Sequence, residues 1–138
     1  MARILAFDYG TKRVGLAVTD PLQMIASPLE TVPSQTVFPF LKNYLEQEPV
    51  EAFVLGWPRD LQGRETDSSL EVSRFFQTLR NRYPQIPVHK IDERFTSSLA
   101  LDAMISGGSK KKDRRKASGK VDQVSATIIL QSFLEQRR

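Results

Sequence analysis

Short runs of aliphatic and β-branched residues alternate along this chain with longer segments in which apolar residues recur at helical spacing. Runs of the first kind, bounded by glycine, proline or acidic residues, predict β-strands. The first two lie within Ile4–Asp20, flank a glycine-bearing turn and predict a β-hairpin. The third, Met24–Val32, contains Pro28, which suits an edge strand or a bulge. The last two, Ala52–Leu55 and Ile86–Ile91, are typical of buried parallel strands.

Helical spacing predicts four helices between and after these strands. Ser34 is the expected N-cap of the first helix, and Pro39 falls in its first turn. The second helix has Thr66 or Asp67 as its expected cap, and the fourth starts at Lys120. In chain order, the apolar stripes of the four helices are Val37, Phe38, Leu41 and Leu45; Leu70, Val72, Phe75, Phe76 and Leu79; Leu99 to Ile105; and Val124 to Leu134. Strands that alternate with helices indicate an α/β protein, and 138 residues predict a single domain, residues 1–138.

Composition narrows the possible chemistry of the chain. The sequence has no cysteine, which excludes disulfides, zinc–thiolate sites and thiol nucleophiles. His89 is the only histidine, so a multi-histidine metal site is excluded and a Ser-His-Asp triad would depend on that residue. The sequence has no signal-peptide pattern and no apolar run long enough to span a membrane. We therefore expect a soluble, cytoplasmic protein.

Positive charge is concentrated in one segment. The chain has a net charge of +4, but residues 110–120 contain seven bases and one acid, a local charge of +6, which leaves −2 for the rest. A basic patch of this kind is typical of a protein with a polyanionic partner such as nucleic acid. Because like charges repel, we expect the segment to be a mobile loop when no partner is bound.

Three acidic positions coincide with predicted structural boundaries. Asp8 closes the first strand, Glu93 or Asp92 follows the last strand, and Asp122 is expected in the first turn of the last helix. Asp8 and Asp122 have simple structural explanations as well, since aspartate caps turns and complements a helix dipole. If the first and last strands are parallel neighbours, however, the three carboxylates meet at one end of the sheet. Such an all-oxygen site suits Mg²⁺ or Mn²⁺, and two such ions can support phosphodiester hydrolysis.

At this point the sequence resembles a known family, the YqgF family of the RNase H-like superfamily. Its members are described as pre-16S rRNA nucleases and Holliday-junction resolvases. Four segments in the family's order carry the resemblance, which covers nearly the whole chain: Asp8–Ala17, Gly56–Pro58 with Gly63, Asp92–Ser97, and Asp122–Gln131. The departures are mild, because Trp57 replaces the usual leucine and Val124–Ala126 lacks a full alanine pair.

The resemblance implies a fold, a site and a function. The fold is an RNase H-like mixed β-sheet, with a leading antiparallel hairpin and third strand, then parallel strands, and helices on both faces. Asp8, Glu93 and Asp122 would form the catalytic site and bind Mg²⁺ or Mn²⁺, with Glu93 preferred over Asp92 on the family pattern. The expected nucleic-acid-binding residues are Lys12, Arg13 and Arg94, together with the basic side chains Lys110, Lys111, Lys112, Arg114 and Arg115. The favoured function is a metal-dependent endonuclease that matures the small-subunit ribosomal RNA precursor.

Three alternative functions remain open at the level of sequence. The first is an ATP-binding protein, because an Asp-x-Gly-Thr hairpin also opens the actin-like fold, although such proteins need two related domains. The second is a non-catalytic RNA-binding module whose acids are structural. The third is a DNA junction resolvase, which would act as a dimer to make symmetric cuts. The expected partner is nucleic acid, with structured RNA preferred to a DNA junction, and the chain is either a monomer or a homodimer.

Overall fold

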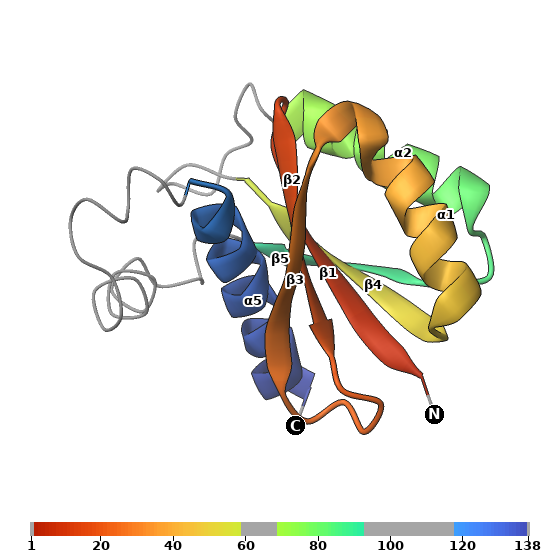
Figure 1. Ribbon diagram of the computed structural model, residues 1–138, viewed down its shortest axis with the longest axis vertical. Helices are drawn as coiled ribbons and strands as arrows, with labels where there is room; N and C mark the ends of the chain where they lie inside the picture. The colour runs from red at the N-terminus through yellow and green to blue at the C-terminus, as the bar shows by residue number, and fades with distance from the viewer. Residues whose placement is uncertain (1, 59–68, 93–117, 138) are drawn as a thin grey trace.

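The structure is a computed structural model that describes residues 2–58, 69–92 and 118–137. For residues 118–122 it describes only the helical backbone. Five strands form one sheet with the order β3-β2-β1-β4-β5 (Figure 1). The strands are β1 (Arg3–Tyr9), β2 (Arg13–Thr19), β3 (Ala26–Pro33), β4 (Val50–Trp57) and β5 (Val88–Asp92). The first three strands are antiparallel to one another, whereas β4 is parallel to both β1 and β5. The mixed sheet with a leading hairpin is therefore confirmed.

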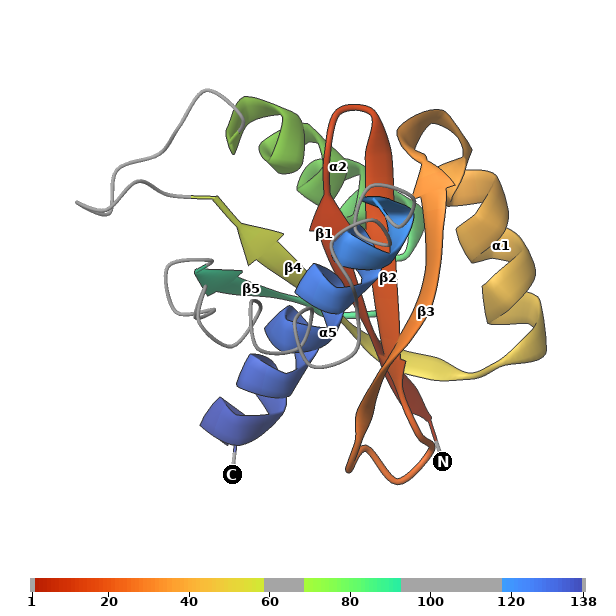
Figure 2. The same cartoon turned by 60° about the vertical axis from the view of Figure 1, so that its left-hand side comes forward.

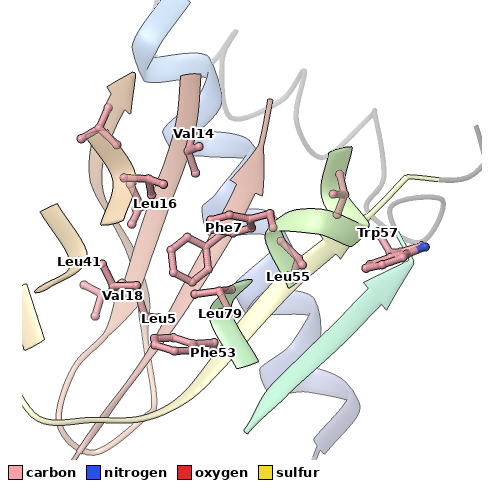
Figure 3. Close-up of a cluster of buried hydrophobic side chains, with 14 residues drawn as sticks. Leu5, Phe7, Val14, Leu16, Val18, Leu41, Phe53, Leu55, Trp57 and Leu79 are labelled. Atoms are coloured by element: carbon pink, nitrogen blue, oxygen red, sulfur yellow. The ribbon is translucent and has the colours of Figure 1, made fainter. Parts of the chain in front are cut away.

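One face of the sheet is covered by helices α1 (Val37–Gln47) and α2 (Ser69–Arg82), as Figure 1 shows. Alternate residues of the strands point to this side, and Figure 3 shows their side chains packed together. The ring of Phe7 makes edge contacts with Phe53 of the neighbouring strand and with Phe75 of α2, at centroid distances of 5.5 and 5.3 Å. Burying such large apolar side chains contributes about 1.5–3 kcal/mol each. This face is the larger of the two described cores.

Helix α5 (Ser118–Arg137) covers the opposite face, which Figure 2 shows. The strand residues on this side are smaller, and Ile4, Ala6 and Val54 pack against Ile129 and Leu130 of the helix. The sheet is thus buried on both sides, which explains the nearly continuous apolar runs of β1, β2 and β4. No helix in the described ranges is long and apolar enough to cross a membrane.

Strand β3 forms one edge of the described sheet, as Pro28 predicted. Leu16 pairs with Glu30 and Ala17 pairs with Pro28, so Leu29 is the extra residue of a bulge. Because proline has no N–H to donate, its place at an edge costs no ladder hydrogen bond. The strand begins at Ala26 rather than at Met24, and the side chain of Met24 is 58% exposed.

The prediction that Ser34 caps the first helix is wrong. Ser34 begins a 3-10 turn, Ser34–Thr36, and α1 follows with Thr36 in the cap position. The hydroxyl of Ser34 donates instead to the backbone carbonyl of Thr11, at 2.6 Å, across 23 residues of sequence. Pro39 does fall in the first turn of α1, as expected.

Two further expectations need correction, one about the burial of a residue and one about the end of a strand. Leu70 was expected to be buried, but it is 66% exposed, whereas Val72, Phe75 and Leu79 are buried. Leu70 precedes Val72 by two residues, about 200° around the helix, and so lies off the apolar stripe. Strand β4 also continues through Gly56 to Trp57, two residues beyond the predicted run Ala52–Leu55.

Candidate functional site

Asp8 lies inside the β-ladder, one residue before the end of β1. Its partner across the antiparallel pair is Gly15 of β2. Because side chains alternate along a strand, Asp8 shares the α5-facing side with Ile4 and Ala6. Asp8 is half-buried, unlike the fully buried Ala6. An acidic group therefore ends an otherwise apolar row beneath α5.

Glycines lie beside Asp8 on both neighbouring strands. Gly15 is its direct partner in β2, and Gly56 follows Leu55, which pairs with Phe7. Neither glycine has a side chain that could fill the space next to the carboxylate. Sequence reasoning missed this arrangement, although a glycine within a strand is itself a signal that a ligand or another backbone approaches closely.

The β1–β2 turn at this end of the sheet is held by backbone contacts. The Gly10 N–H donates to the carbonyl of Arg13 at 3.0 Å, and the Ser34 N–H donates to the carbonyl of Lys12 at 3.0 Å. Gly10 has no room for a side chain, because a Cβ there would lie 2.8 Å from the Arg13 carbonyl oxygen. The turn is therefore fixed both within the hairpin and from the start of the 3-10 turn at Ser34.

This turn presents the first two predicted phosphate-binding residues. The side chains of Lys12 and Arg13 are both exposed. Arg13 lies two residues before Gly15 and therefore on the same, α5-facing side of β2. This makes it the diagonal neighbour of Asp8. Diagonal neighbours in an antiparallel pair are about 7–8 Å apart, within reach of an arginine side chain. The structure thus brings one predicted cation to the same side of the sheet as the first predicted acid.

The second acidic motif begins at the end of β5, two strands away from Asp8. The expectation that the first and last strands are neighbours is wrong, because β4 lies between β1 and β5. Asp92, the last residue of β5, pairs with Trp57 at the end of β4. At about 4.8 Å between strands, β1 and β5 are roughly 10 Å apart. The strands are nevertheless parallel, so they end on the same side of the molecule.

The alternation of β5 distinguishes the two candidate acids in this motif. Ile91 packs beneath α5, whereas Val88 packs with the core on the α1 and α2 side. Lys90 lies two residues after Val88 and therefore on the same side of the strand. Its Nζ is 4.0 Å from the centre of the Trp57 ring on that side. Asp92 therefore belongs to the side that faces away from Asp8. Glu93 and Arg94 lie outside the described residues.

Next to Asp8 in sequence, on the side of β1 that faces α2, the surface is packed with aromatic rings. Tyr9 stacks on Phe75 with ring centroids 4.6 Å apart. Burial raises the pKa of the Tyr9 hydroxyl, and the nearby carboxylate of Glu71 raises it further. Tyr9 thus remains a neutral phenol near neutral pH. Tyr9 is therefore part of the aromatic packing on the α2 side of β1.

Asp122 lies on α5, near its amino-terminal end. It is at least the fifth residue of the helix, so the expectation of a place in the first turn is wrong. Position 122 precedes the buried Ala126 by one turn and Ile129 by two, which places it on the sheet-facing stripe. The acid is therefore not placed where it would best complement the helix dipole.

The direction of α5 relates position 122 to Asp8. At the far end of the helix, Arg137 donates to the side-chain oxygen of Gln23 at 2.9 Å, and the Gln23 amide donates to the carbonyl of Ala2. Fifteen helical residues from 137 back to 122 span about 22 Å. The strand from Ala2 to Asp8 spans about 20 Å in the same direction. Positions 122 and 8 are therefore at similar heights along the sheet, and Figure 2 shows the amino-terminal end of α5 near the end of β1.

Part of the predicted site cannot be placed. The basic side chains Lys110, Lys111, Lys112, Arg114 and Arg115 lie outside the described residues. Within the ranges that the structure does describe, no three acidic or histidine side chains form a cluster that could hold a metal ion. Of the three predicted acids, only Asp8 has a described side chain. At position 122 the structure describes the backbone, and Glu93 lies outside the described residues.

The strand order and the helices on both faces of the sheet are those of an RNase H-like fold, and comparison with a solved structure agrees. The chain is similar in fold to Thermus thermophilus RuvC, solved "in complex with Holliday junction substrate", with a TM-score of 0.60. The likeness covers 99% of this chain and 96% of that one at 13% sequence identity, so it concerns the fold alone.

Sequence comparison identifies the family. The RuvX family, described as "Holliday junction resolvase", matches residues 2–136, and the chain belongs to it. A relative from Phocaeicola vulgatus is 50% identical over 138 residues, which is all of this chain and 99% of the relative. Another, from Amoebophilus asiaticus, is 51% identical over 134 residues, covering 97% of this chain and 94% of the relative. Both are named "Putative pre-16S rRNA nuclease", and the resemblance to the YqgF family is confirmed.

Proposed function

We propose that this protein is a divalent-metal-dependent endonuclease that cleaves phosphodiester bonds in the precursor of the small-subunit ribosomal RNA. The observation that carries the proposal is the place of Asp8, a half-buried acid on the α5 side of β1 with Gly15 directly opposite and Arg13 diagonal to it. A half-buried carboxylate is stabilised by a cation or by a hydrogen-bonding network. The names of the full-length relatives support the choice of RNA.

Asp8, Glu93 and Asp122 are proposed as the three carboxylates of the site. Asp8 and position 122 lie on the same side of the sheet and at similar heights. As the third carboxylate, Glu93 is preferred to Asp92. Asp92 shares a side of β5 with Val88 and Lys90, and that side faces away from Asp8. Residue 93 is the next position along the chain, and continued alternation would place it on the α5 side with Ile91.

The proposed ligands are all carboxylate oxygens, the donors that Mg²⁺ and Mn²⁺ prefer. Gly15 and Gly56 place no side chain beside Asp8 in the neighbouring strands. Bound there, the metal would activate a water molecule and stabilise charge on the leaving oxygen. The protein groups would fix the position of the ions through Asp8, Glu93 and Asp122.

Cations around the same strand end are proposed to hold the substrate. Arg13 is the diagonal neighbour of Asp8 and can reach a phosphate bound beside it. Lys12, at the tip of the turn, would contact the next phosphate along the strand. Arg94 and the basic residues of segment 110–120 would extend this surface, and each cation that neutralises a phosphate adds to the salt dependence of binding.

The second candidate function is a Holliday-junction resolvase. The description of the family and the likeness of the fold to RuvC favour this alternative. It predicts a homodimer with two sites related by twofold symmetry, since two strands must be cut. A nuclease that trims ribosomal RNA can act as a monomer.

A cleavage assay separates the two candidates. The wild-type protein and Asp8→Asn would each be incubated with precursor ribosomal RNA and with a four-way DNA junction, with Mg²⁺, with Mn²⁺ and with a chelator. We expect the wild type to cut the RNA only in the presence of metal and Asp8→Asn to bind the RNA without cutting it. Cleavage of the junction alone would favour the resolvase. Cleavage of neither substrate would contradict the nuclease assignment.

A further inference from the structure

A second cationic surface lies along β5, on the α2 side of the sheet. Here α2 ends next to the beginning of β5, and together they border a cavity of about 360 Å³. We call this the β5 groove, and its lining residues are Phe76, Arg80, Pro84, Ile86, Pro87 and Val88. The floor is aromatic and aliphatic, whereas Arg80 is exposed at the rim. Lys90, two residues further along β5, continues the cationic side of the groove.

Aromatic rings hold the two cations of this surface in place. The Lys90 Nζ lies 4.4 Å from the centre of the Phe76 ring and 4.0 Å from that of Trp57. The guanidinium of Arg80 lies 5.5 Å from the same Phe76 ring. A cation held over an aromatic ring keeps its full charge and still has N–H groups free to donate. The side chains are thus positioned in advance, which lowers the entropic cost of binding an anion.

The chemistry of the groove selects a particular class of ligand. Two fixed cations attract an anion, and flat apolar rings and prolines offer surfaces on which a base can stack. A nucleotide strand combines both properties, because phosphates repeat along it and every base has a π-face. An acidic peptide would satisfy the cations but leave the apolar floor without a matching group.

The β5 groove leads toward the proposed catalytic site. Strand β5 extends about 13 Å from Val88 to Asp92, the axial rise of about four nucleotides along one strand of a duplex. Lys90 lies between the groove and the end of the strand, where Glu93 follows. A nucleic acid held at the site could therefore continue along this edge of the described sheet.

We propose that the β5 groove binds the strand of the nucleic-acid substrate that flanks the cleavage site, with Arg80 and Lys90 each neutralising one phosphate. This inference rests on the proposed nuclease function, and it adds a binding surface on the side of the sheet opposite Asp8. Arg80 and Lys90 are positioning residues, and neither takes part in the chemical step.

A structural role is the competing explanation. Arg80 lies in the last turn of α2, where a cation complements the helix dipole, and Lys90 covers the Trp57 ring. Arg82 provides a matched control, because it shares the last turn of α2 but lies over Phe38 of α1, at 4.6 Å, away from the groove. A dipole effect or a loss of total charge would affect Arg80 and Arg82 alike.

The test is a salt titration of binding without cleavage. A fluorescently labelled RNA hairpin with a 16-base-pair stem, as the probe, would be titrated with the full chain in a chelator, and its anisotropy followed at several salt concentrations. The proteins would be wild type, Arg80→Gln, Lys90→Met, the double variant, and Arg82→Gln. Lys90→Met preserves the contact with the rings, and thermal melting would verify that each variant is folded.

Each phosphate contact contributes about 0.7–0.9 to the slope of log K against log salt. We therefore expect the double variant to have a slope flatter by about 1.4–1.8, and each single variant a slope flatter by about half of that. Arg82→Gln should keep the wild-type slope. Equal slopes in all five proteins, or an equal loss in Arg82→Gln, would overturn the inference.

The two proposals fail in distinguishable ways. If the wild type binds the hairpin with a groove-dependent slope but cuts no RNA in the presence of metal, the nuclease proposal fails and the groove remains. If the wild type cuts RNA and the groove variants bind like the wild type, the groove alone is refuted. A wild-type chain that does not bind the hairpin at low salt would overturn both proposals.

Discussion

Two aspartates at opposite ends of the β1–β2 hairpin have different environments. Asp20 follows β2, and its carboxylate accepts hydrogen bonds from the backbone N–H groups of Leu22, Met24 and Ile25 at 3.1, 2.9 and 2.8 Å. Asp8 lies within the ladder of β1, where a glycine is its partner. Both acids are next to a turn, and the carboxylate of Asp20 binds three amides of the turn that follows it.

The difference shows how a structural acid can be separated from a candidate catalytic one. Three backbone donors and the positive φ of 59° at Gln23 shape the loop around Asp20, so its conformation accounts for the acid. The turn next to Asp8 is closed by the backbone bond from Gly10 to Arg13 and is supported by Ser34. We therefore assign a folding role to Asp20, and the metal-binding role of Asp8 is our proposal.

The largest expected effect is on cleavage by Asp8→Asn. We expect cleavage of precursor RNA to fall by about 10²-fold or more, the loss seen when one group that stabilises a transition state is removed. Asp20→Asn is the matched control and should retain wild-type cleavage. Combining Asp8→Asn with Asp122→Asn should cost little more than either change, because residues that act as a unit are not additive. Losses that multiply independently would contradict a shared site.

The next largest effect should come from Gly10→Ala, which tests the turn that carries Lys12 and Arg13. The added Cβ would lie 2.8 Å from the backbone oxygen of Arg13, so the turn must shift. We expect the free energy of unfolding to fall by about 1–3 kcal/mol, the usual cost of overpacking. Chemical denaturation measures this change. A stability equal to that of the wild type would mean that the turn adapts without strain.

Ser34→Ala should have a smaller effect on stability. It removes the hydroxyl that bonds to the Thr11 carbonyl, and a hydrogen bond of this kind contributes about 0.5–1.5 kcal/mol. Thr36→Ala, the control, removes a bond of similar length to the carbonyl of Pro33, which does not involve the hairpin turn. We expect both variants to lose stability but only Ser34→Ala to bind the RNA hairpin more weakly. An equal affinity in both would show that the turn does not position its cations for binding.

The smallest effect concerns the pH dependence of stability due to Asp20. Hydrogen bonds from the backbone of Ile25 and Met24 hold the pKa of Asp20 below its ordinary value. A group with a lowered folded-state pKa stabilises the protein above the unfolded-state pKa, and this stabilisation is lost as the pH falls through the folded-state pKa. In thermal melts below about pH 4, the wild type should therefore lose more stability than Asp20→Asn. Parallel pH profiles of the two proteins would contradict this role.

The sequence predicted the local parts of this fold well. Alternation and apolar runs identified the hairpin, the later parallel strands and, apart from Leu70, the stripes of α1, α2 and α5, because these patterns depend on residues close together in the chain. The predicted helix with Leu99 to Ile105 lies outside the described residues. Pro28 correctly indicated an edge with a bulge, since proline restricts its own position in a sheet. Trp57, which stands where the family usually has leucine, is buried in the core.

The features that sequence reasoning missed depend on contacts distant in sequence. The insertion of β4 between β1 and β5 is a matter of strand order, which the apolar runs leave undetermined. Ser34 has the composition of an N-cap, but its hydroxyl binds a carbonyl 23 residues away. The glycines beside Asp8 come together only when β2 and β4 pair with β1. The roles of Asp8, Glu93 and Asp122 remain predictions.

The most direct test of the account is the binding of Mn²⁺ in the absence of nucleic acid. Isothermal titration calorimetry would compare the wild type with Asp8→Asn and Asp20→Asn, after melts confirm that all three are folded. We predict that the wild type and Asp20→Asn bind Mn²⁺ with the same affinity and stoichiometry, and that Asp8→Asn has lost this binding. If Asp8→Asn binds Mn²⁺ as the wild type does, Asp8 is not a metal ligand and the proposed site is wrong.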